Sequence, residues 1–432
     1  MVKMSNLQSH LAANGLLEPF QSAYRKGHST ETALLRVVND LLQASDKGDV
    51  SILTLLDLSA AFDTIDHSTM FKRLEIFGCT GIALNWFKSY LTGRTQSVSI
   101  GSKCSKVTNL KYGVPQGSVL GPVLFTIYTS TLSTIVSPTG LSYHLFADDT
   151  QLHSSAPPTD LPSLSDTMSN CVNNVSEWME KSKLKMNDEK TEVLVVASSN
   201  KLKNVKFDEL NGLTVSDINI PFSKSVRNLG IFLDGQLSME DHIRHLSKVL
   251  YFQLRRIAKI RHLLSVESAN KLCVSLILSK LDYCNSLLYG VSEKHLAKLQ
   301  RIQNSAARLV LRRDKRSSAS ELLKTLHWLP IKARIEYKIS TLCFKCLSSD
   351  SNAAPTYLSS LLNPYIPSRS LRSQNAQLLS LPRFSLKSCG YRSFTVSGPT
   401  IWNSLPISLR KIQSLCTFKK HLKTHLFTKF LT

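Results

Sequence analysis

Short apolar runs predict β-strands in the first half of the chain. The run Val50–Asp57 is short, has β-branched residues near its start and is apolar on both faces, which is typical of a central buried strand. Leu141–Ala147 predicts a second buried strand, and Thr150–Ser154 is its expected partner on the return. Weaker strand patterns occur at Thr95–Ile100, Lys106–Tyr112, Glu192–Ala197 and Val226–Leu233.

Apolar residues spaced three or four positions apart predict helices around these strands and through the second half. Residues 1–48 show this spacing, with breaks at Gly15, Pro19 and Gly27. Further helices are expected at Ser68–Phe77, Ile82–Leu91, Val123–Leu132, about 161–182, Met239–Leu263, Val266–Leu281, Lys294–Arg312 and Lys332–Leu347. Residues 351–432 are rich in Ser, Leu and basic residues and are interrupted by Pro. The pattern therefore predicts an α+β domain to about residue 235, a helical domain to about 350, and a basic tail.

Charge is distributed unevenly between the two halves. Residues 1–235 carry 21 Lys and Arg against 22 Asp and Glu, whereas residues 236–432 carry 32 against 9, and no acidic residue follows Asp350. Such a one-sided excess of positive charge is typical of a surface that binds a polyanion. A basic but merely solvated surface is the alternative, and the completeness of the asymmetry favours nucleic acid.

Length, composition and targeting patterns bound the class of protein. The 432 residues, 42% of them hydrophobic, suffice for two or three domains with substantial cores. No run approaches the roughly 20 apolar residues of a membrane span, and the N-terminus has no apolar segment of the signal-peptide kind. We therefore expect an intracellular protein, in the nucleus or cytoplasm, whose nine cysteines are reduced thiols.

Acidic side chains end the two strongest predicted strands. Asp57 follows the first strand, and Asp148 and Asp149 follow the second. Neighbouring carboxylates repel one another, and burial strengthens the repulsion, so they need a positive partner. Carboxylates at neighbouring strand ends suit divalent cations, and two such ions can hold the attacking and leaving oxygens of a phosphoryl transfer. For an isolated Asp-Asp pair, a polar hairpin turn is the alternative.

Two loops beside these strands contain further candidates. Phe62 follows Asp57 by five positions, where its ring lies either in the core or near a metal-bound substrate. Asp66 is expected to cap the next helix, and His67 to be a structural hydrogen-bonding residue. Gly113–Ser118 is a Gly-Pro loop that opens a helix, and its glycines permit close approach of a ligand, although most such loops are only turns.

The order of these segments resembles the reverse transcriptases of non-LTR, LINE-type retrotransposons. Leu55–His67 resembles their first palm motif, Tyr112–Phe125 resembles the second, and Phe146–Asp149 resembles the metal motif. Leu184–Thr191 is similar to the next palm element, and Val226–Asp234 to the primer-grip hairpin. The segments that resemble the thumb and tail of jockey-like elements are Leu281–Tyr289, Leu299–Ala307 and Leu326–Pro330.

The resemblance implies an α+β fold of the right-hand polymerase type, with an antiparallel palm sheet. It divides the chain into partial fingers (1–48), a palm and fingers core (49–235), a helical basic thumb (236–350) and a basic C-terminal region (351–432). The implied activity is RNA-directed DNA synthesis with two Mg²⁺ ions, for which Mn²⁺ can substitute. The implied partners are an RNA template, a DNA primer or RNA–DNA hybrid, and dNTPs.

The same resemblance assigns roles to single residues. The expected metal ligands are Asp57, Asp148 and Asp149. Lys190 is expected to be the general acid for pyrophosphate, and Arg25, in a segment that resembles part of the fingers, to approach the triphosphate. Phe62 matches the gate that excludes a ribose 2′-hydroxyl, and Gln116 and Gly117 match a loop that contacts the incoming nucleotide and template.

Alternatives remain beside this hypothesis. The sequence shows neither the endonuclease that usually precedes such a polymerase nor the earlier fingers motifs, so it resembles a 5′-truncated element. A catalytically silent remnant that only binds nucleic acid is therefore one alternative. A maturase-like splicing cofactor is another, against which the jockey-like tail argues. Cys343 and Cys346 form a lone CxxC pair, for which buried thiols are favoured over a zinc site because no second pair follows at ligand spacing.

Overall fold

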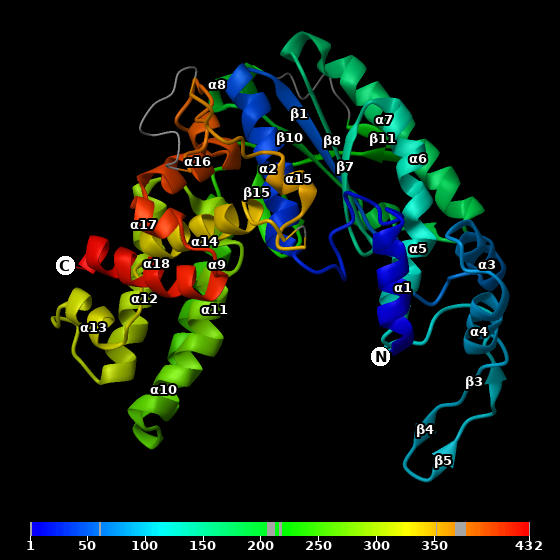
Figure 1. Ribbon diagram of the computed structural model, residues 1–432, viewed down its shortest axis with the longest axis horizontal. Helices are drawn as coiled ribbons and strands as arrows, with labels where there is room; N and C mark the ends of the chain where they lie inside the picture. The colour runs from blue at the N-terminus through cyan, green and yellow to red at the C-terminus, as the bar shows by residue number, and fades with distance from the viewer. Residues whose placement is uncertain are drawn as a thin grey trace.

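Figure 1 shows the computed structural model of the chain, which describes residues 2–59, 62–204, 212–215, 218–350, 352–367 and 377–431. Ala60 and Ala61, in the first palm-like motif, lie outside the described residues. The same holds for short parts of the expected palm and C-terminal region.

A five-stranded sheet lies at the centre of the first half. Its strand order is β13-β10-β1-β8-β7, and every neighbouring pair is antiparallel except β10 and β13. The strands are β1 (Val50–Leu56), β7 (Ser142–Phe146), β8 (Asp149–Ala156), β10 (Glu192–Val196) and β13 (Phe222–Ser223). The two predicted strands and the return partner are therefore confirmed, and so is the antiparallel sheet, but β7 lies at the edge of the sheet and is buried only in part.

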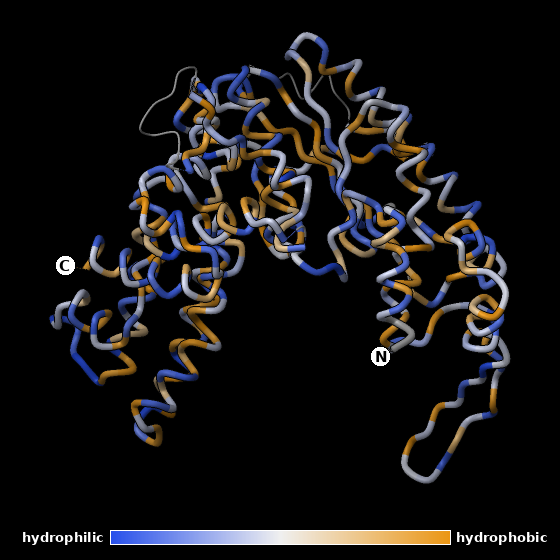
Figure 2. The backbone as a smooth tube through the Cα atoms, viewed as in Figure 1, coloured by the Kyte–Doolittle hydropathy of each residue, from blue (hydrophilic) through white to orange (hydrophobic). Residues whose placement is uncertain are grey.

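Strand β1 is apolar on both faces because each face packs into a different core. Ile52 and Leu53 are both fully buried. Successive side chains of a strand point to opposite faces, so Ile52 joins one hydrophobic cluster and Leu53 the other. Figure 2 shows hydrophobic residues running along these central strands.

The Ile52 side of the sheet is covered by the helices of the first half. The helices that share this core are α1 (Val2–Ala13), α3 (His67–Ile76), α4 (Gly81–Leu91), α5 (Gly121–Thr129), α6 (Ser133–Val136) and α7 (Leu161–Lys181). Beyond α4, a narrow ribbon of paired strands extends away from the body (Figure 1). It consists of β3 (Thr95–Gln96) with β6 (Thr108–Asn109), and β4 (Ser99–Ile100) with β5 (Lys103–Cys104).

Helix α2 (Thr30–Lys47) connects the Leu53 side of the sheet to the second half of the chain. It begins with a capping box between Ser29 and Thr32 and ends at Gly48, whose φ of 93° suits glycine. Twelve of its eighteen residues are buried, because it packs against the sheet on one side and against later helices on the other. Residues 1–48 therefore contain the helices and breaks that the pattern predicts.

A hairpin and a helical bundle follow the sheet. The expected strand Val226–Leu233 is instead two strands, β14 (Ser225–Asn228) and β15 (Ile231–Asp234), because Leu229 and Gly230 both take positive φ and reverse the chain. The helices that follow are α9 (Glu240–Ile260), α10 (Val266–Cys273), α11 (Ser279–Asp282), α12 (Glu293–Leu311), α13 (Ala319–Thr325) and α14 (Ile331–Cys346). A π-helical turn at Val274–Leu278 joins α10 to α11, so the predicted helix Val266–Leu281 is confirmed with this interruption.

The described part of residues 351–432 is packed against the bundle and is not a loose tail. Helix α18 (Leu415–Leu431) lies on α14, with Phe418 fully buried and stacked on Phe344 at 4.5 Å between ring centroids. The remaining helices of this region are α15 (Thr356–Ser359), α16 (Phe394–Ser404) and α17 (Ile407–Arg410). The expectation of a tail is corrected because Phe418, Leu422 and Leu426 share one helix face that joins the core.

Two expectations about cysteine and membranes bear on the fold. All nine cysteines are free. Cys343 is buried and Cys346 half-buried on α14, and burial raises the pKa of both thiols, to about 12 for Cys346. Among the described helices, none combines the length and the apolar character needed to cross a bilayer.

Candidate active site

The sheet brings the three predicted aspartates to one end of two neighbouring strands. Strand β1 pairs with β8 so that Leu56 lies opposite Thr150, and Asp57 therefore emerges beside Asp149. Phe146 pairs with Asp149, which leaves Ala147 and Asp148 as a two-residue hairpin loop. Asp57 and Asp149 line one cavity of about 440 Å³.

Lys190 provides the positive partner that the carboxylates require. It follows β9 (Lys185–Met186), which pairs with β2 (Leu58–Ser59), and its Nζ lies 2.9 Å from Oδ2 of Asp57. Asn187 donates a backbone hydrogen bond to the carbonyl of Asp57 at 3.0 Å and so fixes the approach of this segment. The hydrogen bond and charge of Asp57 raise the pKa of Lys190, which keeps the ammonium protonated.

The pKa values of the adjacent carboxyl groups of Asp148 and Asp149 are both raised, which disfavours ionisation of the two together. Desolvation by surrounding protein atoms and the charge of Asp57 raise the pKa of Asp148. The side chain of Asp149 is exposed to solvent. The protein around its carboxyl, together with Asp148 and Asp57, nevertheless raises its pKa to about 6. Lys190 opposes both shifts. The site thus carries more negative charge than one ammonium offsets.

The donor set fits a hard divalent cation, although it is not assembled around one. Over the residues that the structure describes, no group of three or more His, Cys, Asp or Glu side chains is close enough to hold a metal ion. The donors are carboxylate oxygens, and Oδ2 of Asp57 is itself buried beside an ammonium. A cation that binds Oδ2 of Asp57 would displace the Lys190 ammonium from that oxygen.

The Gly-Pro loop lies against the loop that follows β1. Gly113 donates to the carbonyl of Ile65 at 2.8 Å, and a Cβ on Gly113 would meet the Asp63 backbone at about 3.0 Å. The side-chain amide of Gln116 donates to both carboxylate oxygens of Asp63, at 2.8 and 2.9 Å. Gly117 has a φ of 74° and open space around it, which suits backbone contact with a ligand.

Phe62 packs against the core of the first half. Its ring is half-buried and stacks on Phe125 of α5 with 4.9 Å between centroids. Its carbonyl accepts a hydrogen bond from Val114 at 3.0 Å, so the Gly-Pro loop fixes its backbone. The stacking supports the core position that the sequence left open, and a position near a metal-bound substrate stays a prediction.

Asp66 and His67 have the structural positions that were expected. The carboxylate of Asp66 caps α3 by accepting from the backbone N–H of Thr69 at 2.8 Å. Partial burial opposes its ionisation, but the hydrogen bonds from Ser68 and Thr69 outweigh burial and lower the pKa of Asp66. His67 is buried and hydrogen-bonds the carbonyl of Gly113 at 2.8 Å.

The structure does not bring Arg25 to the aspartates. Its guanidinium points inward and donates to the backbone carbonyls of Glu18 and Gln21, at 2.5 and 3.0 Å. It lines a separate cavity of about 230 Å³. The expected approach to a triphosphate has no support in these contacts, because the carbonyls of its own loop already bind the side chain.

Two glutamines near the aspartates were not recognised from the sequence. Gln151 lies two positions after Asp149, on the same face of β8, and its buried side chain accepts from Asn228 of β14 at 2.8 Å. The period of two along the strand could have indicated it. Gln21 contacts Ala147, directly before Asp148, and no local pattern indicates that contact.

Comparison with known proteins agrees with this geometry. Residues 3–233 match the family model described as reverse transcriptase (RNA-dependent DNA polymerase). The chain is 29% identical over 312 residues to a probable RNA-directed DNA polymerase from transposon X-element of Drosophila melanogaster, covering 70% of this chain and 33% of that one. It is 27% identical over 305 residues to the RNA-directed DNA polymerase from mobile element jockey of Drosophila funebris, covering 67% and 32%.

The chain spans about a third of the length of these curated relatives. Among solved structures, telomerase from Candida albicans with a fragment of telomeric RNA matches at a TM-score of 0.39 and 12% identity, over 74% of this chain and 53% of that one. A likeness at this TM-score is too distant to bear on function. The family match covers the whole five-stranded sheet and the three aspartates at the end of β1 and β8. The chain belongs to the reverse transcriptase family, on its non-LTR, jockey-like branch, and has the right-hand polymerase fold of that family.

Proposed function

We propose that this chain carries out RNA-directed DNA synthesis as the polymerase part of a non-LTR retrotransposon protein. The observation that carries the proposal is the convergence of Asp57, Asp148 and Asp149 with Lys190 at the end of β1 and β8. Phosphoryl transfer depends mainly on positioning and on charge stabilisation. A cluster of carboxylates whose charge is only partly balanced supplies both, once cations are bound.

The reverse transcriptase family depends on divalent metal ions, and two Mg²⁺ ions at this cluster are part of the proposal. The ligands would be Asp57 and Asp148, with Asp149 completing the cluster. When bound, the ions would activate the primer hydroxyl and offset the charge on the leaving pyrophosphate, and Mn²⁺ would substitute.

The side chains around the cluster have separate proposed roles. Lys190 is protonated and exposed, which suits donation of a proton to departing pyrophosphate. The ring of Phe62 stacks on that of Phe125, and this support suits a rigid barrier against a ribose 2′-hydroxyl. Gln116 and Gly117 lie in the loop that faces Asp63 and would contact the incoming dNTP and the template.

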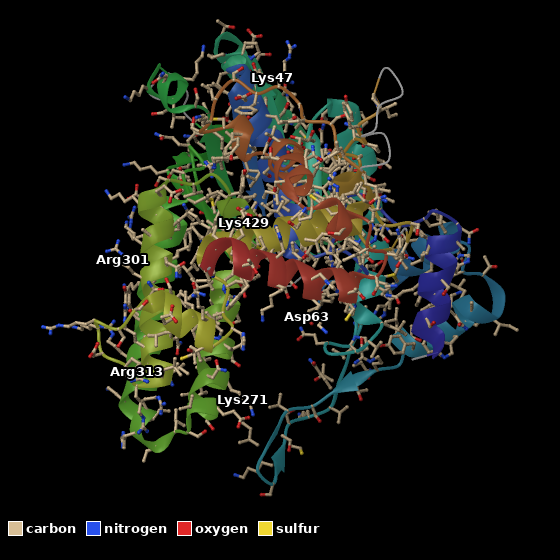
Figure 3. All side chains as sticks on the ribbon, turned by 60° about the vertical axis from the view of Figure 1, so that its left-hand side comes forward. Lys47, Asp63, Lys271, Arg301, Arg313 and Lys429 are labelled. Carbon is tan, nitrogen blue, oxygen red and sulfur yellow. The ribbon has the colours of Figure 1, made fainter. Side chains whose placement is uncertain are left out.

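The basic second half of the chain would hold an RNA template paired with a DNA primer. Figure 3 shows side chains extending outward from the bundle, among them Lys271 of α10, Arg301 of α12 and Arg313 in the loop after α12. All three are exposed. Phosphate neutralisation by such side chains supplies affinity that falls as salt rises. In this proposal residues 1–48 are partial fingers, 49–235 the palm and fingers core, 236–350 the thumb, and 351–432 a C-terminal region that supports them.

Primer extension on poly(rA)–oligo(dT) with purified protein and Mg²⁺ tests the proposal. We expect DNA synthesis that an Asp148→Asn variant reduces by at least about 100-fold. Asp160→Asn, an exposed aspartate at the start of α7, is the matched control and should retain synthesis.

Two outcomes would contradict the proposal. Equal synthesis by wild type and Asp148→Asn would remove the aspartates from the mechanism. Absence of synthesis together with tight, salt-sensitive binding of the hybrid would favour the silent nucleic-acid-binding remnant instead.

A further inference from the structure

Gln21 is bound to both backbone polar groups of the residue before Asp148. Its Oε1 accepts from the N–H of Ala147 at 3.0 Å, and its Nε2 donates to the carbonyl of Ala147 at 3.4 Å. The same Oε1 accepts from the N–H of Ala23 at 2.9 Å, which fixes the side chain to its own segment. Gln21 is only 3% exposed, so water does not compete for these bonds.

The hairpin loop that carries Asp148 needs such support. Ala147 has a φ of 56°, a left-handed conformation that an alanine adopts only at a cost in free energy. Two-residue hairpin loops normally place Gly, Asn or Asp at such a position. A conformation of this kind persists when neighbouring groups determine it from several sides. Here one side-chain amide, that of Gln21, binds both the N–H and the C=O of Ala147.

The backbone around Gln21 continues the sheet beyond its last strand. Strand β7 is at the edge of the sheet, and the chain at Phe20–Ser22 pairs with it in parallel. Leu145 donates to the carbonyl of Phe20 and accepts from the N–H of Ser22, each at 2.9 Å. The backbone hydrogen bonds to β7 therefore hold the Gln21 side-chain amide beside Ala147.

The C-terminal region supports this segment from the other side. The hydroxyl of Ser22 bonds the ring of buried His144 at 2.8 Å and the hydroxyl of Tyr357 at 2.7 Å. The ring of Tyr357 packs edge-on against His144 and stacks on Phe20. Desolvation lowers the pKa of His144 to about 3, so the ring is neutral and takes part as an uncharged hydrogen-bonding group.

We infer that Gln21 is a positioning residue that sets the Asp148 turn through the backbone of Ala147, and that Tyr357 keeps Gln21 in place through Ser22. The backbone conformation of the turn sets the direction of the Asp148 side chain, because Asp148 directly follows Ala147, which Gln21 holds by two hydrogen bonds. The inference rests on the proposed metal-binding role of Asp148 and adds to it a residue from outside the palm.

The test compares two buried glutamines in the full-length protein. Gln21→Met removes the amide at nearly constant volume. Gln303→Met is the matched control, because Gln303 is also fully buried and its Nε2 donates to a backbone carbonyl, that of Leu329, at 2.8 Å. Both variants should lose some thermal stability. Two readouts separate them: Mn²⁺ affinity by electron paramagnetic resonance, and hydrogen exchange of the peptide around residues 143–151.

We expect Gln21→Met to weaken Mn²⁺ binding about tenfold, in the range found when residues that orient metal ligands are removed. Hydrogen exchange at the turn should rise, and Gln303→Met should change neither readout. Tyr357→Phe, which keeps the ring and removes the hydroxyl, should act in the same direction as Gln21→Met but more weakly. It also serves as the second variant if Gln21→Met does not fold.

Other outcomes would contradict either the inference about Gln21 or the proposed metal site. Wild-type Mn²⁺ affinity and exchange in Gln21→Met would overturn the inference, and so would an equal loss in Gln303→Met. If wild-type protein binds no Mn²⁺ in an Asp148-dependent way, the proposed metal site fails. The exchange measurement then still decides whether Gln21 sets the turn.

Discussion

The ammonium of Lys190 lies 2.9 Å from Oδ2 of Asp57, inside the cavity that Asp149 also lines. It acts electrostatically on Asp148 and Asp149 as well, and limits the rise in the pKa of each. One cation thus offsets part of the repulsion among three carboxylates. Divalent ions that bind these carboxylates must compete with Lys190 for Asp57, and this competition makes the site sensitive to pH and to the charge at position 190.

Metal binding should strengthen as pH rises through about 6. Asp149 has a pKa of about 6 in the folded protein against an ordinary value of 3.8, so its proton must leave before it can ligate a cation. We expect Mn²⁺ affinity to increase from pH 5 to pH 7 and then level off. Lys190→Met should move the midpoint upward, because it removes a charge that lowers this pKa. Lys181→Met, at an exposed lysine paired with Glu177, is the control.

The same pKa predicts how the metal-free protein responds to pH. A raised folded-state pKa means that Asp149 contributes stability below about pH 4, and that this contribution is lost as pH rises to about 6. Mg²⁺ should restore the lost stability above pH 6. A Mn²⁺ affinity that does not change between pH 5 and pH 7 would contradict the first expectation, and a melting temperature of the metal-free protein that does not fall between pH 4 and pH 6 would contradict the second.

Asp57→Asn should separate activity from stability. DNA synthesis should fall at least about 100-fold, since a ligand at the reacting centre is lost. The melting temperature of the metal-free protein should stay constant or rise, because one of three repelling carboxylates is neutralised. Thermal melts with and without Mg²⁺ check this. A fall in the melting temperature without metal would show that the Lys190–Asp57 pair stabilises more than the repulsion costs.

Phe62→Val should relax discrimination against ribonucleotides. The shorter side chain opens space beside the nucleotide, and we expect rNTP use relative to dNTP use to rise about tenfold or more. Competitive primer extension measures the ratio. Phe87→Leu is the control, because Phe87 is a buried phenylalanine of α4 in the same core and its replacement leaves Phe62 and its stacking partner intact. It should cost about 1 kcal/mol of stability and leave the ratio unchanged. An unchanged ratio in Phe62→Val would assign Phe62 to the core alone.

Phe418→Ala should show that the C-terminal region is part of the folded core. Phe418 is fully buried between Phe344 and Trp402, so its truncation should lower the free energy of unfolding by about 3–5 kcal/mol. Lys420→Ala, at an exposed position of the same helix, should change it by less than about 0.5 kcal/mol. Urea unfolding measures both. A small effect of Phe418→Ala would restore the picture of a loosely attached tail.

Local sequence determined much of the palm. The apolar run that becomes β1 ends at Asp57 because a strand buried on both faces must be apolar until it leaves the core, and the shorter run that becomes the edge strand β7 ends just before Asp148. The capping role of Asp66 and the helices of the bundle follow from equally local rules, a side-chain oxygen before a helix and a period of 3.6 residues. In each case the cause and the structure lie within a few residues of one another.

Tertiary structure alone decided the contacts that complete the site. Gln21 reaches Ala147 across 126 residues of sequence, and Tyr357 reaches Ser22 across 335. Lys190 meets Asp57, and Arg25 turns to its own loop, for reasons that depend on which segments the sheet and the C-terminal helices bring together. A hydrogen bond or ion pair forms wherever folding places its partners, and the spacing of residues along the chain does not record that placement.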